Sequence, residues 1–320
     1  MICVAGRGMA SGGRLQETIR MRMSTSDCAV ISVIAAFFLS AVMLSSGGPA
    51  QAAGTLAPFK DELFSKQTIL QTGDDGAFEV IDYDEMRDIN GRDQIPQKRV
   101  QQKYVALGIR KAQADETLSL DGIKLDVTRV GPPQNAAFTV IFIHGRDGDR
   151  RLGANDYSFG GNFNRLKNLA AGNGGVYYSP TVKSFDSNGV AAIAGLVRYA
   201  SAPIARPGQS SSPAPRWASQ VCWGIARDEG SVKRLKGMLV MSGVTDPDFT
   251  KRPFSRAKLP LWFAHGSRDP VYVASDQQAL FERLRKAKYP ARFTLFQTGN
   301  HGTPIRMIDW RRVLNWILAA

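Results

Sequence analysis

Cysteine is scarce in this sequence of 320 residues, which contains three. Cys3 and Cys28 lie in an N-terminal segment that we expect to be removed, and Cys222 is the one that follows it. A single remaining cysteine excludes an internal disulfide in the expected mature chain. Cys222 lies in an apolar, helix-like stretch, so we expect it to be a small buried hydrophobic residue.

The sequence also lacks an apolar run long enough to span a membrane. The N-terminal run, residues 29–44, reads AVISVIAAFFLSAVML and is shorter than the ~20 residues that a spanning helix needs. It follows several arginines and precedes Ala50-Gln51-Ala52, a small-x-small pattern typical of signal-peptide cleavage. We expect residues 1–52 to be a signal peptide cut between Ala52 and Ala53, giving a periplasmic or secreted product without a membrane span. An uncleaved membrane anchor is the alternative.

Acidic residues are outnumbered, and the formal net charge is +13. A basic protein can bind nucleic acid, anionic lipid or cell-envelope polymers. The lysines and arginines are scattered, however, and no aromatic-interleaved basic patch or nucleic-acid motif is present. We therefore expect a generally basic surface and no nucleic-acid partner.

From residue 137 onwards, apolar strands alternate with helices. The runs FTVIFIHG, GGVYYSPTV, GMLVMSG, LPLWFAHG and ARFTLFQTG are expected strands, and amphipathic helices separate most of them. Such alternation predicts an α/β fold, a mostly parallel, doubly wound sheet with helices on both faces. We expect this domain over residues 117–320, preceded by an N-terminal extension with some strand over residues 53–116.

Histidine is as scarce as cysteine, and all three histidines follow expected strands: His144, His265 and His301. In open α/β sheets, ligands bind beyond the carboxyl ends of the strands. Asp269 in HGSRDPV and His301 in TGNHG are the best site candidates. The structural alternatives are a turn aspartate before Pro270 and a loop histidine, and for His144 and His265 we favour structural roles.

These motifs resemble the α/β-hydrolase superfamily over about residues 117–320, and in particular bacterial secreted, esterase-like serine hydrolases. The resemblance implies that Asp269 and His301 are the acid and base of a Ser–Asp–His triad in that chain order. It also implies that FIHGRDGD, with His144, Gly145 and Arg146, forms the oxyanion and substrate-binding loop. No metal and no organic cofactor is implied, and the partner expected is a small acyl substrate.

The nucleophile of such a triad is missing from its expected place. The resemblance puts an apolar strand and a small-x-Ser-x-Gly elbow at about residues 207–218, but the sequence reads PGQSSSPAPRWA. Prolines cannot complete the hydrogen bonds of a central strand, and the expected nucleophile position falls at Pro215/Arg216. Ser219 is the nearest substitute, at the start of the next helix. Ser179 and Ser242 are interpreted as turn residues.

We hypothesise that a local frameshift produced this stretch, either as a sequencing error or as a real lesion; the alternative is that the segment is genuine. If Gln209–Ala218 is encoded by CAG TCG TCC TCG CCT GCG CCT CGA TGG GC, the neighbouring frame reads Val-Val-Leu-Ala-Cys-Ala-Ser-Met-Gly. That is an apolar strand entering an elbow. We therefore expect an exported serine hydrolase of esterase, thioesterase or amidase type, inactive as written if the elbow serine is absent. The alternative is a non-catalytic binding protein of the cell envelope with the same fold.

Overall fold

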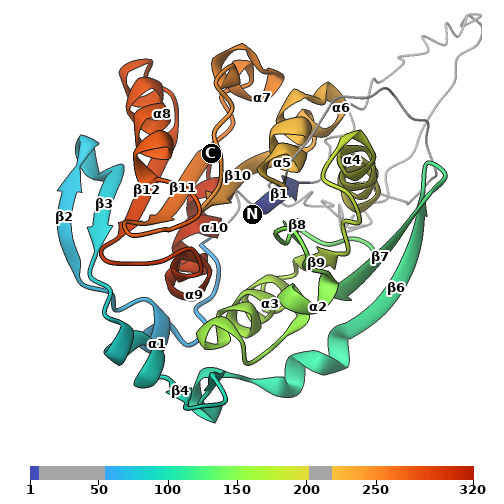
Figure 1. Ribbon diagram of the computed structural model, residues 1–320. Coiled ribbons are helices and arrows are strands. Elements are labelled where there is room, and N and C mark those ends of the chain that lie inside the picture. The colour runs from blue at the N-terminus through green and yellow to red at the C-terminus, as the bar shows by residue number, and fades with distance from the viewer. Residues whose placement is uncertain (7–54, 202–217) are drawn as a thin grey trace, which may run out of the picture. The chain divides into compact units, whose positions relative to one another are not determined.

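The computed structural model of the chain describes residues 1–6, 55–201 and 218–320 (Figure 1), with the backbone alone for residues 218–220. The described residues belong to one compact unit, in which the first residues of the chain join Ala53–Ala320. None of their helices is both long enough and apolar enough to cross a membrane.

A ten-stranded sheet forms the centre of the described residues. Strands β3, β12, β11 and β10 run parallel to one another, as do β8 and β9, while β2, β7 and β6 pair antiparallel towards the edges. In spatial order the strands are β2 (Ile69–Gly73), β3 (Phe78–Ile81), β12 (Ala291–Phe296), β11 (Leu261–Gly266), β10 (Leu235–Met241), β1 (Ile2–Gly6), β8 (Phe138–Phe142), β9 (Val176–Pro180), β7 (Ile123–Val130) and β6 (Gln113–Leu120). A separate short pair joins β4 (Asp93–Gln94) and β5 (Arg99–Val100).

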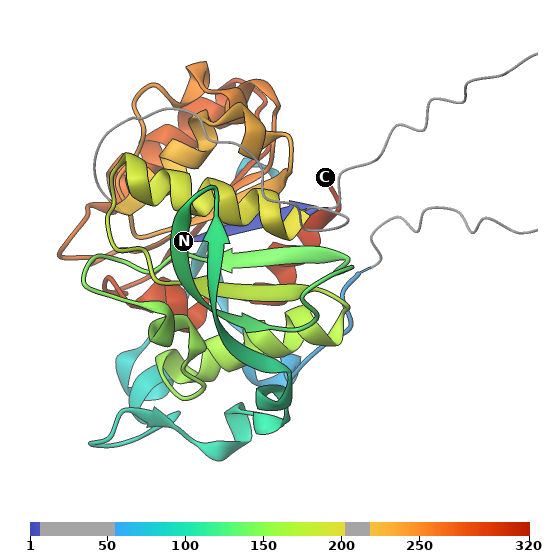
Figure 2. The same ribbon diagram turned by 90° about the vertical axis from the view of Figure 1, so that its right-hand side faces the viewer.

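Helices cover both faces of this sheet (Figures 1 and 2). One apolar core includes side chains from α4 (Ser187–Ser201), α5 (Ala218–Arg227) and α8 (Ala274–Lys286). A second core includes side chains from α3 (Asn162–Gly172), α9 (Thr303–Met307) and α10 (Trp310–Leu318). The predicted α/β class with helices on both faces of the sheet is therefore confirmed. The sheet itself is mixed, with four parallel and five antiparallel neighbouring strand pairs. Shorter helices lie in the connections: α1 (Asp61–Phe64), α2 (Arg150–Ala154), α6 (Glu229–Val232) and α7 (Pro253–Arg256).

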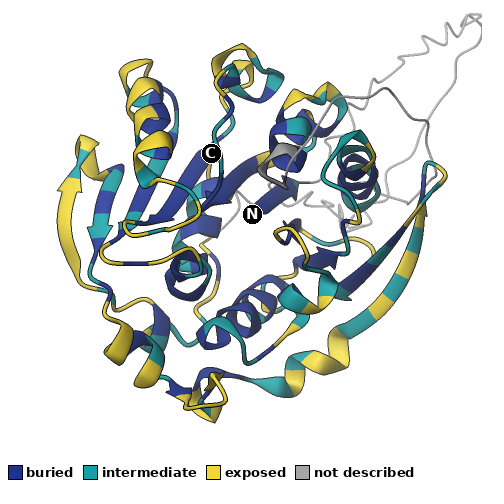
Figure 3. Cartoon of the chain, in the orientation of Figure 1, coloured by how far each residue is buried: buried dark blue, intermediate teal, exposed yellow. Residues whose placement is uncertain are grey.

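The central strands are buried on both faces, the edge strand β2 is largely exposed, and the edge strand β6 is mostly half-buried (Figure 3). This burial explains the continuous apolar runs of the sequence, because a strand covered by helices on both sides has no solvent-facing positions. β8 and β11 are buried at every residue.

Strand β1 differs from what the sequence predicts. Its residues lie in the segment expected to be a cleaved signal peptide, yet β1 occupies the centre of the sheet between β8 and β10, antiparallel to both. Ile2, Cys3, Val4 and Ala5 are each at most 1% exposed. Their apolar pattern fits a strand covered on both faces as well as it fits a leader. Cleavage after Ala52 stays a prediction, and it would sever β1 from the rest of the chain.

The N-terminal extension expected over residues 53–116 contributes strands to the main sheet. β2 and β3 come from the expected N-terminal extension, but β3 pairs in parallel with β12 and so continues the main sheet. Phe78 of β3 stacks on Phe293 of β12, with 5.8 Å between ring centroids. Because the two parts share one sheet and one core, residues 53–116 are built into the same unit as residues 117–320.

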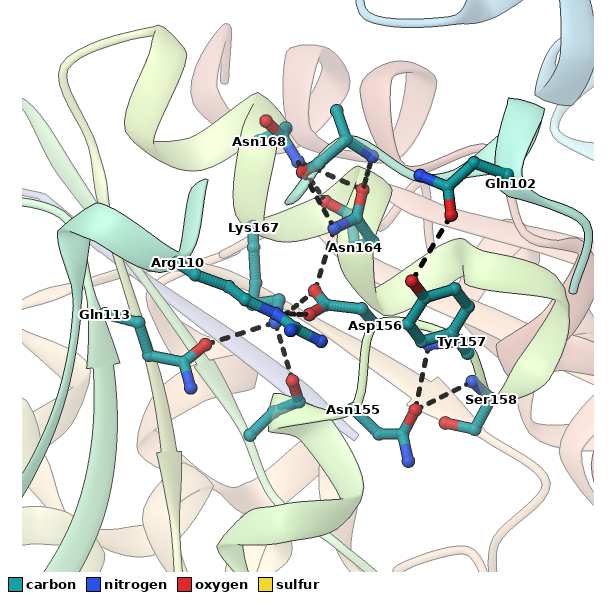
Figure 4. A network of polar contacts seen from close by, with 12 residues as sticks. Gln102, Arg110, Gln113, Asn155, Asp156, Tyr157, Ser158, Asn164, Lys167 and Asn168 are labelled. Carbon is teal, nitrogen blue, oxygen red and sulfur yellow. Dashed lines mark hydrogen bonds and ion pairs between the residues drawn. The ribbon is translucent and has the colours of Figure 1, made fainter. Parts of the chain in front are cut away.

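A buried polar network attaches a further part of this N-terminal region to α3 (Figure 4). Asp156 accepts hydrogen bonds from Arg110 at 2.7 Å and Asn164 at 2.8 Å, and pairs with Lys167 at 2.7 Å. Asn164 in turn accepts a hydrogen bond from the backbone N–H of Ala106. Burial raises the pKa of Asp156, but these donors outweigh it and lower the pKa below its ordinary value. The ion pair therefore stays charged and compensates for the burial of Lys167, which is 0% exposed.

Candidate active site

Asp269 and His301 form a hydrogen-bonded pair beyond the carboxyl ends of β11 and β12. His301 Nδ1 lies 2.9 Å from Asp269 Oδ2. The Asp269 side chain is 0% exposed, whereas that of His301 is 45% exposed. An ionised carboxylate accepts a hydrogen bond from Nδ1–H, which leaves Nε2 free of a proton and able to accept one from a substrate group or nucleophile.

Backbone hydrogen bonds hold the other carboxylate oxygen of Asp269. Its Oδ1 accepts from the N–H groups of Val271 at 2.8 Å and Tyr272 at 3.1 Å. Burial raises the pKa of Asp269, but the hydrogen bonds from His301, Val271 and Tyr272 outweigh it and hold the pKa below the ordinary 3.8. Asp269 therefore stays ionised in mild acid and continues to orient His301. The turn-forming role considered for Asp269 is therefore present, and the same side chain contacts His301, while its role as the catalytic acid stays a prediction.

Two glycines bring the loop of His301 against the end of β11. A Cβ built on Gly266 would lie 2.3 Å from the carbonyl oxygen of Gly299 and 2.4 Å from that of Asn300. The backbone N–H of Arg268 donates to the same Gly299 oxygen at 2.9 Å. The loop that carries Asp269 and the loop that carries His301 are therefore in direct backbone contact. The absence of a side chain at Gly266 permits this contact.

Replacing Gly266 with alanine should disrupt the Asp269–His301 pair. The added Cβ must displace the Gly299–His301 backbone, and a shift of about 1 Å in a catalytic group lowers rates by about 10²-fold. The check is the His301 ring proton spectrum together with the rate of ester hydrolysis. Gly108→Ala is the control for a general glycine effect, because its Cβ would meet nothing within 4 Å and its φ lies outside the left-handed region. Unchanged His301 resonances in the Gly266 variant would contradict the argument.

His144 has a structural role as well as a place beside the site. It is 2% exposed, its Nδ1 lies 2.6 Å from the carbonyl oxygen of Gly145, and its Nε2 accepts the N–H of Val182 at 2.9 Å. These partners require the neutral ring with the proton on Nδ1, and burial lowers its pKa. His144 therefore fixes the loop after β8 and has no ring nitrogen left for proton transfer.

His265 lies behind the acid. Its ring is 0% exposed, with Nδ1 at 3.0 Å from the Gly266 oxygen and 3.9 Å from Asp269 Oδ2. Burial lowers its pKa, so the ring is neutral. The structural role expected for His265 agrees with this position, in which it packs beneath Asp269 and is closed off from the cavity side.

A cavity of about 540 Å³ lies in front of the pair. The cavity is lined by His301 and by His144, Gly145 and Arg146. The expected base and the expected oxyanion loop therefore line the same cavity. Most of its other walls are apolar: Met1, Phe142, Ile143, Leu152, Phe159, Val240, Met241, Val271, Tyr272 and Ile305. A cavity of this size with a few polar groups at one end suits a small apolar ligand.

Ser242, for which the sequence predicts a turn, lies in the wall of the cavity. It follows β10, lines the cavity, is 6% exposed and has a φ of 41°. Among the described residues, it is the one serine in the cavity wall. Its hydroxyl helps lower the pKa of Asp269, but its Oγ is buried without a hydrogen-bond partner among the described residues.

The expected nucleophile position at Pro215/Arg216 lies outside the described residues. Ser219 falls at the start of α5, where the described part of the chain includes the backbone alone. Cys222 is fully buried in the same helix, as expected. The structure thus brings together the predicted acid, base and loop, and the nucleophile remains a prediction.

No family model matches this sequence, and no curated protein matches it. Several solved structures do. A thermostable esterase matches with a TM-score of 0.47 and 15% identity, over 65% of this chain and 63% of that one, less than two thirds of its length. XC6422 from Xanthomonas campestris, an α/β serine hydrolase without a lid, matches with a TM-score of 0.41 and 14% identity, over 64% and 93%. The epoxide hydrolase VrEH1 from Vigna radiata matches with a TM-score of 0.42 and 12% identity, over 65% and 97%. All three TM-scores are below 0.5, and the α/β fold of this chain is shown by its own sheet and helices.

Proposed function

We propose that this chain is built as a hydrolase of small acyl compounds, of esterase, thioesterase or amidase type. The observation that carries the proposal is the 2.9 Å contact between His301 and the buried Asp269 at one end of an apolar cavity. An imidazole whose Nδ1 donates to a carboxylate is a general base at Nε2.

The loop after β8 supplies the complementary part of the chemistry. Acyl transfer develops negative charge on the carbonyl oxygen, and backbone N–H groups that point at this oxygen lower the barrier. Gly145 and Arg146 line the same cavity as His301. In the proposal, the N–H of Arg146 holds the oxyanion while the apolar walls hold the acyl group.

Turnover by the chain as written should be slow. The described serine in the cavity, Ser242, makes no hydrogen bond to His301, whereas a nucleophile must lie within hydrogen-bond reach of His301 Nε2. A missing nucleophile leaves the acid, the base and the oxyanion loop in place, and these parts alone retain a fraction of the catalysis.

The dependence of residual hydrolysis on His301 tests this proposal. With p-nitrophenyl acetate as substrate, we expect His301→Ala to lower the rate above buffer by about 10²-fold, the usual contribution of a general base. Gln297→Ala is the matched control, an exposed position in the same loop. Equal rates for the parent chain and His301→Ala would remove the acid–base role and favour a non-catalytic binding protein of the cell envelope.

A further inference from the structure

Strand β1 is bound to the sheet entirely through contacts with distant parts of the chain. Val4 pairs with Val140 of β8 on one side and with Gly237 of β10 on the other. The carbonyl oxygen of Met1 accepts the N–H of Ile143 at 2.8 Å, and the N–H of Gly6 donates to the Arg234 oxygen at 3.1 Å. All of these partners lie at or beyond residue 138, so β1 is positioned by the groove that receives it.

The groove between β8 and β10 has the properties of a binding site for an extended apolar peptide. Ile2 and Val4 belong to the core on the α10 side, and Cys3 and Ala5 to the core on the α4 side. Successive side chains of the strand thus enter two different apolar layers, and each is at most 1% exposed. Such a groove selects small or β-branched apolar residues and rejects charged ones.

The direction of β1 supports its treatment as a separate bound element. β10 is parallel to β11, and β8 is parallel to β9. β1 runs antiparallel to both of its neighbours, so it does not continue the parallel order around it. Without β1, two strand edges would face each other unpaired in the middle of the sheet, and unpaired edges recruit extended chains.

We propose that the groove between β8 and β10 binds residues 2–6 as a noncovalent strand, so that this segment stays in place after the chain is cut between β1 and Ala53. In the intact chain, the covalent connection raises the effective concentration of β1 at the groove. The contacts that hold it, however, are made by β1 itself. Cleavage between Ala52 and Ala53, which the N-terminal sequence predicts, is therefore compatible with an occupied groove.

Occupancy of the groove also bears on the candidate active site. Met1, at the start of this strand, lines the same cavity as His301 and Arg146. The segment that carries the bound strand therefore forms part of the cavity wall through Met1, and its loss would open that part of the wall. Retention of the strand after cleavage would keep the cavity closed on this side.

The test uses the full chain with a site-specific protease sequence inserted between Gly12 and Gly13. After cutting, we expect the fragment that contains residues 1–12 to elute with the larger piece in about equimolar amount during native gel filtration. Elution of the fragment at its own size would overturn the proposal, whether the larger piece stays folded or aggregates. The result does not depend on hydrolytic activity, so it stands apart from the proposed function.

An exchange experiment adds specificity to this test. The cut chain is incubated with a labelled peptide of residues 1–12 or with the same peptide carrying Val4→Asp, and bound label is measured. We expect the parent peptide to exchange into the groove and the Val4→Asp peptide to be rejected. Equal binding of the two peptides, or none of either, would contradict a groove that recognises this strand.

The thiol of Cys3 reports occupancy directly. Burial raises its pKa to about 12, so it should resist iodoacetamide at pH 8 while β1 is bound. Labelling is read on the tryptic peptide of residues 1–7. We expect protection in both the intact and the cut chain, and labelling at the rate of a free peptide in the cut chain would count against the bound strand.

Discussion

Val4→Asp should unfold much of the chain. Val4 is 0% exposed, lies in the middle of β1 and is paired on both sides. The substitution removes about 1.5–3 kcal/mol of apolar burial and places an unpaired carboxylate in the core. We expect the free energy of unfolding to fall by on the order of 4 kcal/mol, which is a large part of the usual total of about 5–15 kcal/mol. Urea unfolding followed by tryptophan fluorescence measures it.

Leu70→Asp is the matched control for this substitution. Leu70 lies on the edge strand β2 and is 49% exposed, so an aspartate there remains in water and should change stability by less than about 0.5 kcal/mol. Intact mass must first show that residues 1–6 are present in the sample. Equal stability of Val4→Asp and the parent chain, with β1 retained, would show that the centre of the sheet does not depend on this strand.

The parallel strands and the acid–base pair were predictable because their signals are local. FTVIFIHG and LPLWFAHG are continuous apolar runs, and a polar residue after each parallel strand must reach the same edge of the sheet. Asp269 and His301 therefore had to lie near each other once the strands were placed. Their burial difference and the two backbone donors to Asp269 come from loop geometry, which the sequence pattern does not encode.

The place of β1 was not predictable from local pattern. ICVAG is a five-residue apolar run near the N-terminus, a composition shared by leaders and by buried strands. Its partners are more than 130 residues away, and pairing over such distances leaves no periodic signal. Ser242 was missed for a different reason. A serine before a glycine at a strand end is typical of a turn. The available signal was that Ser242 and Asp269 follow neighbouring parallel strands, β10 and β11, and therefore reach the same edge of the sheet.

Restoring the neighbouring reading frame should create an active hydrolase. The change replaces Ser210–Ala218 with Val-Val-Leu-Ala-Cys-Ala-Ser-Met-Gly, in which Arg216→Ser supplies the nucleophile. With acid, base and oxyanion loop already positioned, we expect ester hydrolysis to rise by about 10³-fold or more, the contribution of a nucleophile within a triad. The control is the same replacement with Arg216→Ala in place of Arg216→Ser. It lacks the nucleophile and should hydrolyse esters as slowly as the parent chain.

A phosphonate probe and the Cys3 thiol together show how the restored chain works. The probe should form an adduct on the serine at position 216, and an adduct on Ser242 instead would place the nucleophile at the end of β10.

The restored segment connects α4 to α5, which flank the groove between β8 and β10 on the side of Cys3. An apolar strand there competes with β1 for the same groove. Exposure of Cys3 to iodoacetamide in the restored chain would therefore mean that the new strand has displaced β1, and that β1 occupies the position of the missing element in the chain as written.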